Sequence, residues 1–348
     1  MRPPRSAPAR GAAIVLLVLP LHALGAQRGP AGVVIASNML DHTATLLDAA
    51  TGASLATLPT GRGPHEVAVS HDGRWALVSN YGPREAPGST ITVIDVAARA
   101  VARTIDLGDV RRPHGVSFLP GDSAFVVTSE VGRAVALVDF RDGRVLRTLP
   151  SEGRATHMLG VSADGRRAVT ANIADATISV LDLRGGGART IAVARQPEGI
   201  ALAPNGSRAW VGSNRDSVVL VVDTDRGAVV DTVRGFGLPY RIALSADGRT
   251  ALVTDPARGE VRAFDAATHA PRFTVTFPRD SLLPTAEVPG SPSPEGAVIT
   301  PDGTWAFVTL QGRNRVAAID LARGRVAWYG VTGAWSDGIG YSPLATRR

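Results

Sequence analysis

The chain has 348 residues, of which 44% are hydrophobic and 20% are charged, and its formal net charge is +6. It contains no cysteine, which excludes disulfides, thiolate metal sites and a cysteine nucleophile. All 37 basic residues are arginine, so Schiff-base catalysis by lysine is excluded, and so small a net charge does not by itself indicate nucleic-acid binding.

The first 26 residues have the pattern of a secretory signal peptide. Three arginines precede the apolar run Ala12–Leu24, and small residues follow up to Ala26. This run is too short for a membrane-spanning helix. We expect cleavage near Ala26, which lowers the formal charge by three, and export of residues 27–348 to the periplasm or the medium as one soluble domain without a membrane span.

A ten-residue phrase then recurs along the whole chain. Its first full copy reads Pro-His-Glu-Val-Ala-Val-Ser-His-Asp-Gly at Pro64–Gly73, and a last, truncated copy covers Ser336–Pro343. The residues at the second position of the seven copies are His65, His114, His157, Glu198, Tyr240, Glu295 and Asp337. A spacing of roughly forty to fifty residues indicates one supersecondary unit that is repeated because no copy can bury its apolar faces alone.

Each copy contains four short runs rich in β-branched residues. In the fourth copy they are Glu198–Ala203, Ser207–Gly212, Ser217–Val222 and Ala228–Val233. The dipeptide Asn205-Gly206 between the first two supplies the positive φ of a tight hairpin. The sequence therefore predicts an all-β fold, a seven-bladed β-propeller of four-stranded antiparallel blades.

The two ends of the repeat region complete each other. The last copy has only a first strand, Asp337–Ser342, whereas the N-terminal part has runs for the other three, Val33–Ser37, Thr45–Asp48 and Ser54–Leu58. We expect the C-terminal strand to pair with the N-terminal strands and close the ring, which removes exposed strand edges.

One carboxylate recurs at the end of the third strand of every unit. The seven are Asp48, Asp95, Asp139, Asp182, Asp223, Asp265 and Asp320. A short acceptor at this point can bind the backbone N–H groups of the following turn. Because every unit has one, these residues are interpreted as structural rather than catalytic.

The repeat resembles that of the YVTN family of seven-bladed propellers, in which Pro-x-Gly-Val-Ala-Val-Ser-Pro-Asp-Gly is followed by Tyr-Val-Thr-Asn and Val-Ile-Asp. The segments that match are Val78-Ser79-Asn80, Val127-Thr128-Ser129, Ala171-Asn172, Ser213-Asn214, Val253-Thr254-Asp255 and Val308-Thr309. The resemblance covers residues 32–343 and implies the propeller fold. It implies no single activity, because one scaffold can carry unrelated functions.

In such a propeller the second-position residues form an inner ring at one mouth of the central channel. A second ring is expected at the same mouth and consists of Asn38, Asn80, Glu130, Asn172, Asn214, Asp255 and Leu310. Three residues before the inner ring, the first four copies have Arg62, Arg111, Arg154 and Arg195. Arginine suits bidentate binding of carboxylate or phosphate. We therefore predict a binding protein whose ligand is an anionic small molecule or an acidic protein segment, with solvated loop arginines as the alternative interpretation, and we expect a monomer.

Two enzymatic alternatives use the same inner ring. Some related propellers are lactonases with a Pro-Arg-His phrase, which the segments Arg112-Pro113-His114 and Arg154–His157 approach without reproducing it. The resemblance implies a His–Glu pair that activates water, with arginine stabilising the oxyanion. The other alternative is a metal-dependent oxidoreductase with a divalent ion on His65, His114 and His157. The leading interpretation needs no cofactor.

Overall fold

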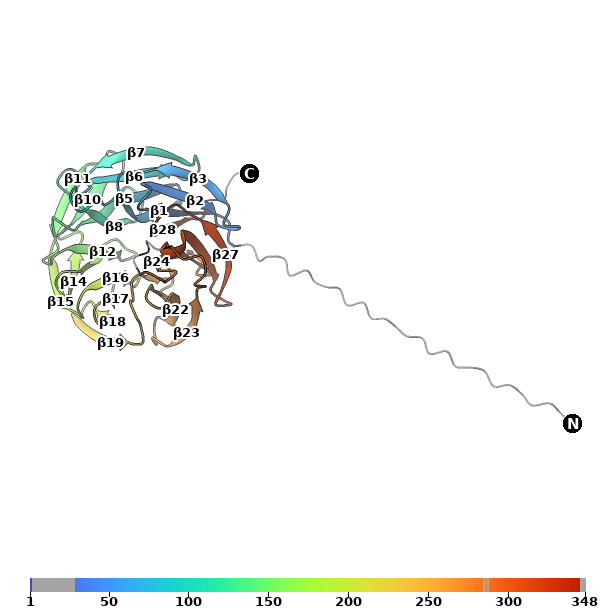
Figure 1. Ribbon diagram of the computed structural model, residues 1–348. Helices are drawn as coiled ribbons and strands as arrows, with labels where there is room; N and C mark the ends of the chain where they lie inside the picture. The colour runs from blue at the N-terminus through green and yellow to red at the C-terminus, as the bar shows by residue number, and fades with distance from the viewer. Residues whose placement is uncertain (2–28, 284–285, 287, 345–348) are drawn as a thin grey trace.

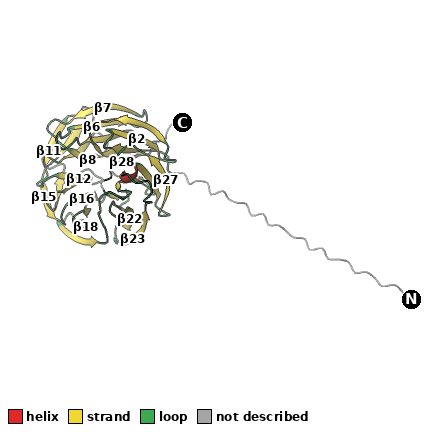
Figure 2. Cartoon of the chain, viewed as in Figure 1, coloured by secondary structure: helices red, strands yellow, loops and turns green. Residues whose placement is uncertain are grey.

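The computed structural model describes residue 1, residues 29–283, residue 286 and residues 288–344. The predicted signal peptide lies outside these residues, apart from Met1. The described chain forms seven four-stranded antiparallel sheets arranged in a ring (Figure 1). Its regular structure is almost entirely strand (Figure 2), with one 3-10 turn, η1 (Gln311–Arg313). The predicted fold class, a seven-bladed β-propeller, is confirmed.

The blades are numbered along the chain, and their strands are given from the channel outward. Blade 1 consists of β28 (Ser336–Ser342), β1 (Val33–Asn38), β2 (Thr43–Asp48) and β3 (Ser54–Pro59). Blade 2 consists of β4 (Pro64–Val69), β5 (Trp75–Asn80), β6 (Thr90–Asp95) and β7 (Ala100–Asp106). Blade 3 consists of β8 (Pro113–Phe118), β9 (Ala124–Ser129), β10 (Ala134–Asp139) and β11 (Val145–Pro150). Blade 4 consists of β12 (Thr156–Val161), β13 (Arg167–Asn172), β14 (Thr177–Asp182) and β15 (Ala188–Ala192).

The remaining three blades follow the same plan. Blade 5 consists of β16 (Pro197–Leu202), β17 (Arg208–Ser213), β18 (Val218–Asp223) and β19 (Ala228–Val233). Blade 6 consists of β20 (Ile242–Leu244), β21 (Thr250–Asp255), β22 (Glu260–Asp265) and β23 (Pro271–Thr276). Blade 7 consists of β24 (Pro294–Ile299), β25 (Trp305–Leu310), β26 (Arg315–Asp320) and β27 (Arg325–Val331). The innermost strands contact one another in succession around the channel.

Blade 1 closes the ring as predicted. The C-terminal strand β28 pairs with β1 in an antiparallel register that places Val33 opposite Ser342 and Ile35 opposite Gly340. The Tyr341 hydroxyl also donates a hydrogen bond to the Ala31 carbonyl, 2.5 Å away. Residues from the two ends of the chain therefore share one sheet, and both edges that an open ring would expose are paired.

The hydrophobic core lies between blades rather than within them. One buried cluster joins Leu77 and Ile91 of blade 2 to Phe125 and Val127 of blade 3, and another joins blades 4 and 5 in the same way. Each sheet has two apolar faces, and each face is covered by the next blade. This arrangement explains why the unit is repeated.

The glycine at the third position of the phrase is required by close packing of the innermost strands. A Cβ on Gly338 would lie 2.1 Å from the His65 carbonyl oxygen, and a Cβ on Gly296 would lie 2.2 Å from the Asp337 carbonyl oxygen. At these blade junctions the backbones approach too closely for any side chain.

A hydroxyl on the second strand fixes the inner-ring backbone of the next blade. Ser37 donates to the His65 carbonyl (2.5 Å), and Thr309 donates to the Asp337 carbonyl (2.7 Å). Thr128 makes the same bond to the carbonyl of His157. The Thr of the Val-Thr segments therefore positions the channel residues.

The recurrent aspartates cap the turns, as predicted. The Asp48 Oδ1 atom accepts hydrogen bonds from the N–H groups of Ala50 and Thr51, both 3.0 Å away. Asp182 accepts in the same way from Arg184 and Gly185. These carboxylates lie in the turns between third and fourth strands and are not part of a channel site.

Candidate functional site

A β-bulge at the start of the innermost strand orients the side chains at the second and third positions of the phrase toward the channel. The pairing of β4 with β5 shifts register between Pro64 and Val67, and the same shift occurs at the start of β8, β12, β16 and β24. A bulge releases a residue from the ladder and redirects its side chain. The residues that vary between copies are therefore those freed from strand pairing.

Three inner-ring histidines stack on one another. The His114 ring lies between those of His65 and His157, with centroid separations of 4.1 and 3.6 Å and tilts of 47° and 35°. The Tyr81 ring contacts His65 and His114 edge-on, with centroids 5.2 and 5.3 Å away. His65 and His157 are each 8% exposed and His114 is fully buried.

The two outer histidines of the stack are each paired with a carboxylate of the inner ring. His65 Nδ1 lies 2.7 Å from Asp337 Oδ2, and His157 Nε2 lies 2.7 Å from Glu198 Oε1. Burial by itself lowers the pKa of His65, but the nearby Asp337 and Glu66 outweigh it and raise this pKa to about 10. For His157, burial is likewise outweighed, mainly by Glu198, and the pKa rises to about 9.

His114 has a different environment. Neither of its ring nitrogens has a hydrogen-bond partner in the described part of the chain. Burial, followed by the positive charges of His157 and His65, lowers its pKa well below the ordinary value. The ring is therefore neutral at pH 7 and presents one donor and one acceptor nitrogen.

Arg241 is the main site residue that the sequence analysis missed. Its guanidinium is buried and donates to Glu198 Oε1 at 3.0 Å and to Glu66 Oε1 at 2.5 Å, and Asp337 Oδ1 lies 4.0 Å away. Glu66 belongs to blade 2 and Arg241 to blade 6, so the pair reaches across the channel. The signal was present in the sequence, because positions 66 and 241 have charged residues where most copies have glycine.

Tyr81 and Glu130 extend the cluster. The Tyr81 hydroxyl hydrogen-bonds the Glu130 carboxylate, whose other close neighbour is His157 Nδ1, 3.9 Å from Glu130 Oε2. The Arg112 guanidinium stacks over the Tyr81 ring and donates to its hydroxyl at 3.3 Å. Burial raises the pKa of Glu130, but His157, Tyr81 and Arg112 outweigh it and lower the pKa overall.

The two remaining inner-ring residues lie where the chain enters the innermost strands of blades 6 and 7. Tyr240 is buried, with the Arg241 guanidinium 4.7 Å above its ring. Glu295 is fully buried, and its Oε1 atom accepts a hydrogen bond from Ser293 at 2.6 Å. The structure therefore brings all seven predicted inner-ring residues to the channel.

The four predicted arginines fall into two classes. Arg154 Nε lies 2.5 Å from Asp175 Oδ1, and Arg195 is bonded to Asp216 in the equivalent way. The exposed guanidinium groups of Arg62 and Arg111 have no acidic partner among the described residues. Only these two are available to a ligand without first losing an ion pair.

Most of the second ring serves the blades instead of the mouth. Asn38 Nδ2 donates to the hydroxyls of Thr43 and Thr45, and its Oδ1 accepts from Gly333 N–H. The Asn80 amide makes the same contacts in blade 2. The expected ring at this level is therefore largely structural, and Glu130 is the member that joins the channel cluster.

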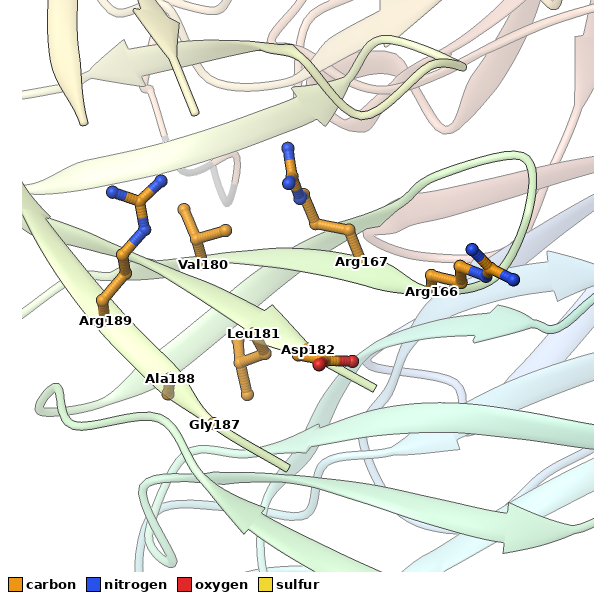
Figure 3. A pocket seen from close by; sticks show the side chains of 8 residues that line it. All are labelled: Arg166, Arg167, Val180, Leu181, Asp182, Gly187, Ala188 and Arg189. Atoms are coloured by element: carbon orange, nitrogen blue, oxygen red, sulfur yellow. The ribbon is translucent and has the colours of Figure 1, made fainter. Parts of the chain in front are cut away.

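A cavity of about 460 Å³ lies away from the channel at the outer part of blade 4 (Figure 3). Arg167, Val180 and Arg189 line it from the same side of the sheet. Arg167 Nη1 is bonded to the Asp225 carboxylate at 2.7 Å, and Arg189 donates to backbone carbonyls of the same turn. These arginines tie blade 4 to blade 5, so we do not regard this cavity as the functional site.

Within the described residues, no helix has the length and apolarity that crossing a bilayer requires. No protein-family model matches the sequence, and no curated protein matches it. The fold is similar to that of hydrazine synthase from Kuenenia stuttgartiensis, with a TM-score of 0.67 and 18% identity over 88% of this chain and 99% of that chain. It is also similar to a functionally unknown protein from Desulfotomaculum acetoxidans DSM 771, with a TM-score of 0.71 and 15% identity over 89% of this chain and 99% of that chain. At these identities the likeness supports the seven-bladed propeller fold alone.

Proposed function

We propose that this chain is an exported propeller of the YVTN type that binds a small anionic ligand at the channel mouth. The observation that carries the proposal is the buried cluster of ionisable side chains in which Glu66, Glu198, Asp337 and Arg241 surround the histidine stack. Removing charges from water costs several kcal/mol per ion even when they are paired. The blades do not need such a cluster for folding, because apolar packing between neighbouring sheets already stabilises them.

The anionic character of the ligand is supported by the unpaired arginines. Arg62 and Arg111 precede His65 and His114 on the loops that enter β4 and β8. Together with Arg112, whose guanidinium lies over Tyr81, they would bring three positive charges to this mouth. Guanidinium groups bind carboxylate or phosphate oxygens bidentately.

The test compares two double variants of equal charge. Arg62→Ala/Arg111→Ala removes the unpaired arginines, whereas Arg154→Ala/Arg195→Ala removes those already bound to aspartate. Titration calorimetry and thermal shift with inorganic phosphate, succinate and citrate should show binding that the first variant loses and the second retains. Binding of an acidic peptide alone, or equal losses in both variants, would refute a small-anion site on these arginines.

A lactonase-type hydrolase is the second candidate, and the His157–Glu198 pair supports it. A carboxylate 2.7 Å from an imidazole nitrogen orients the ring and increases its basicity. The other nitrogen, Nδ1, lies 3.9 Å from Glu130 Oε2, and because the pKa of His157 is raised to about 9, this nitrogen could accept a proton from water only in alkaline solution. Hydrolysis of a panel of five- and six-membered lactones that is lost in His157→Gln, with the fold unchanged, would support this activity. No turnover above the variant's background would exclude it.

Export is supported by the sequence of residues 1–26. Expression of the full chain in a bacterial host, followed by fractionation and N-terminal sequencing, tests it. A mature protein that begins near residue 27 in the periplasm or medium is the expected result, and an unprocessed cytoplasmic product would refute it.

A further inference from the structure

His114 is the starting point, because it is the one inner-ring histidine without a carboxylate partner in the described structure. The side chain is fully buried, and neither ring nitrogen has a hydrogen-bond partner among the described residues. An unsatisfied buried polar group costs about 1–3 kcal/mol, and such groups in native proteins call for an explanation. A bound ligand that uses a nitrogen lone pair would supply one.

His114 is one of three neighbouring residues whose potential metal-ligand atoms lie close together. His65, Glu66 and His114 each offer one donor atom, and the three atoms lie within 4.8 Å of one another. We propose that these three residues bind a divalent first-row transition-metal ion, Zn²⁺ or Fe²⁺, in the channel of the propeller. This site is separate from the proposed anion-binding arginines and can be tested without an anionic ligand.

Asp337 and Arg241 orient the ligand side chains of His65 and Glu66. Metal binding at His65 displaces the proton from Nε2 and keeps the proton on Nδ1, opposite Asp337 at 2.7 Å. Metal-binding histidines usually have such a carboxylate behind them, which fixes the ring and its tautomer. The guanidinium of Arg241 binds Glu66 Oε1 and so orients the carboxylate, leaving its second oxygen free to act as ligand.

Once the ion has displaced the proton of His65, local charge favours a cation at this point. Glu66 and Asp337 then bring two negative charges next to the proposed ligands, against the one positive charge of Arg241, which Glu198 shares. Opposite charges attract strongly in a buried environment. A divalent ion reverses the local excess, which would also strengthen the attraction for an anion at the rim above it.

His157 is excluded from the ligand set by its geometry. No nitrogen of His157 belongs to the group of ligand atoms, among the described residues, that lie within 4.8 Å of one another. The proposed set of two histidines and a carboxylate therefore differs from the three histidines considered from the sequence. Three ligands of this type leave coordination positions open and suit zinc or non-haem iron.

Metal coordination requires a small contraction of the set. Ligand atoms bound at about 2.0–2.1 Å in tetrahedral geometry are roughly 3.4 Å apart. Because the three atoms lie within 4.8 Å of one another, side-chain rotation has to bring them closer by up to about 1.4 Å.

The experiment measures metal binding by the purified protein directly. Metal content is determined by plasma mass spectrometry after purification without chelator, and the protein is then stripped with EDTA and titrated with Zn²⁺ and, anaerobically, Fe²⁺. We expect about one ion per chain and at least a tenfold loss of affinity in His114→Gln and in Glu66→Gln. Asp337→Asn should weaken binding about 10–100-fold by loss of the carboxylate behind His65.

The matched control is His71→Gln, because His71 is an exposed histidine paired with Asp122 outside the channel. It should bind metal as the parent protein does. Thermal unfolding of each stripped variant verifies folding, and Glu66→Gln replaces His114→Gln if the latter is unfolded. Failure of the parent protein to bind either ion saturably, or equal losses in His71→Gln and His114→Gln, would overturn the proposal. Phosphate binding measured on stripped protein remains a separate readout, so loss of the metal site and loss of the anion site are distinguishable.

Discussion

Replacing Arg241 by methionine should destabilise the protein much more than replacing an exposed, paired arginine. Arg241 is buried and is bonded to both Glu66 and Glu198. Methionine fills a similar length of the channel but removes the guanidinium from both carboxylates, which leaves Glu198 with His157 and Glu66 with His65, 3.6 Å away. The matched control is Arg195→Met, which removes an arginine that is largely exposed and bonded to Asp216.

The magnitude follows from the two environments. Breaking a buried ion pair costs about 3–5 kcal/mol, whereas exposed pairs contribute roughly 0–1 kcal/mol. A domain of about 320 residues has an unfolding entropy near 0.7 kcal/mol per kelvin. Arg241→Met should therefore lower Tm by about 4–7 °C, and Arg195→Met by about 1 °C.

Scanning calorimetry of the EDTA-treated protein at pH 7 measures both variants. Glu66→Gln/Arg241→Met, in which one of these carboxylates is neutralised, should recover part of the lost stability. The gap between Arg241→Met and the parent should also narrow below pH 5, where the carboxylates that have lost the guanidinium can take up protons. If Arg241→Met costs no more than Arg195→Met at pH 7, the guanidinium is not the central counter-ion of the cluster and this reasoning fails.

Three further predictions concern other features. The pKa of His157 is raised from 6.5 to about 9, so its pair stabilises the fold fully below pH 6.5 and is lost as pH rises through 9. The free energy of unfolding, measured with urea after EDTA treatment, should fall between pH 6.5 and 9.5 in the parent protein, and this fall should be smaller in His157→Gln by up to about 3 kcal/mol. An equal fall in both proteins would contradict the assignment of the raised pKa to His157. Gly338→Ala should lower the free energy of unfolding by about 1–3 kcal/mol or more, because the added Cβ would collide with backbone atoms. The control Gly187→Ala has nothing within 4 Å of the added Cβ and should change this free energy by less than about 0.5 kcal/mol. Equal Tm values for the two variants would refute the packing argument. Asp175→Asn should free Arg154 and tighten phosphate binding several-fold by calorimetry; unchanged affinity would show that this arginine is too far from the ligand.

The fold could be predicted because every blade needs the same few residues. The turn aspartates, the hairpin Asn-Gly and Asp-Gly pairs and the alternating apolar strands act locally, so their positions in the sequence give their positions in the structure. The closure of the ring could also be predicted, since β28 lacks three partners that β1, β2 and β3 supply. Strands of blade 5 differ from the predicted ranges by one residue at each affected end.

The structural role of the second ring could not be predicted, because the sequence does not show which groups will hydrogen-bond an amide side chain. The sequence predicts Asn38 at the channel mouth, yet its side chain hydrogen-bonds two threonine hydroxyls of its own blade and the N–H of Gly333, in the connection between β27 and β28. Those partners come from segments that the repeat brings together only after folding. Glu130 does not have this role because Ser129 occupies the equivalent position: Pro113 pairs with Ser129 as Pro64 pairs with Asn80, and Glu130 lies one residue further on.

The same limit applies to the arginines, whose positions repeat although their roles do not. Arg154 and Arg111 occupy equivalent places before the inner ring, and only Arg154 is bonded to an aspartate in the neighbouring hairpin. The inner ring shows the opposite case, because Glu66 and Arg241 depart from glycine in two separate copies and meet across the channel. Glu66 without Arg241 would be buried with His65, 3.6 Å away, as its remaining close cation, and Arg241 without Glu66 would keep its bond to Glu198 alone; either loss is costly in a buried site, whereas the two charges together neutralise each other. Two charged residues that replace the glycine of the repeat and compensate each other across the channel serve the channel and not the individual blades. We therefore place the function at the channel.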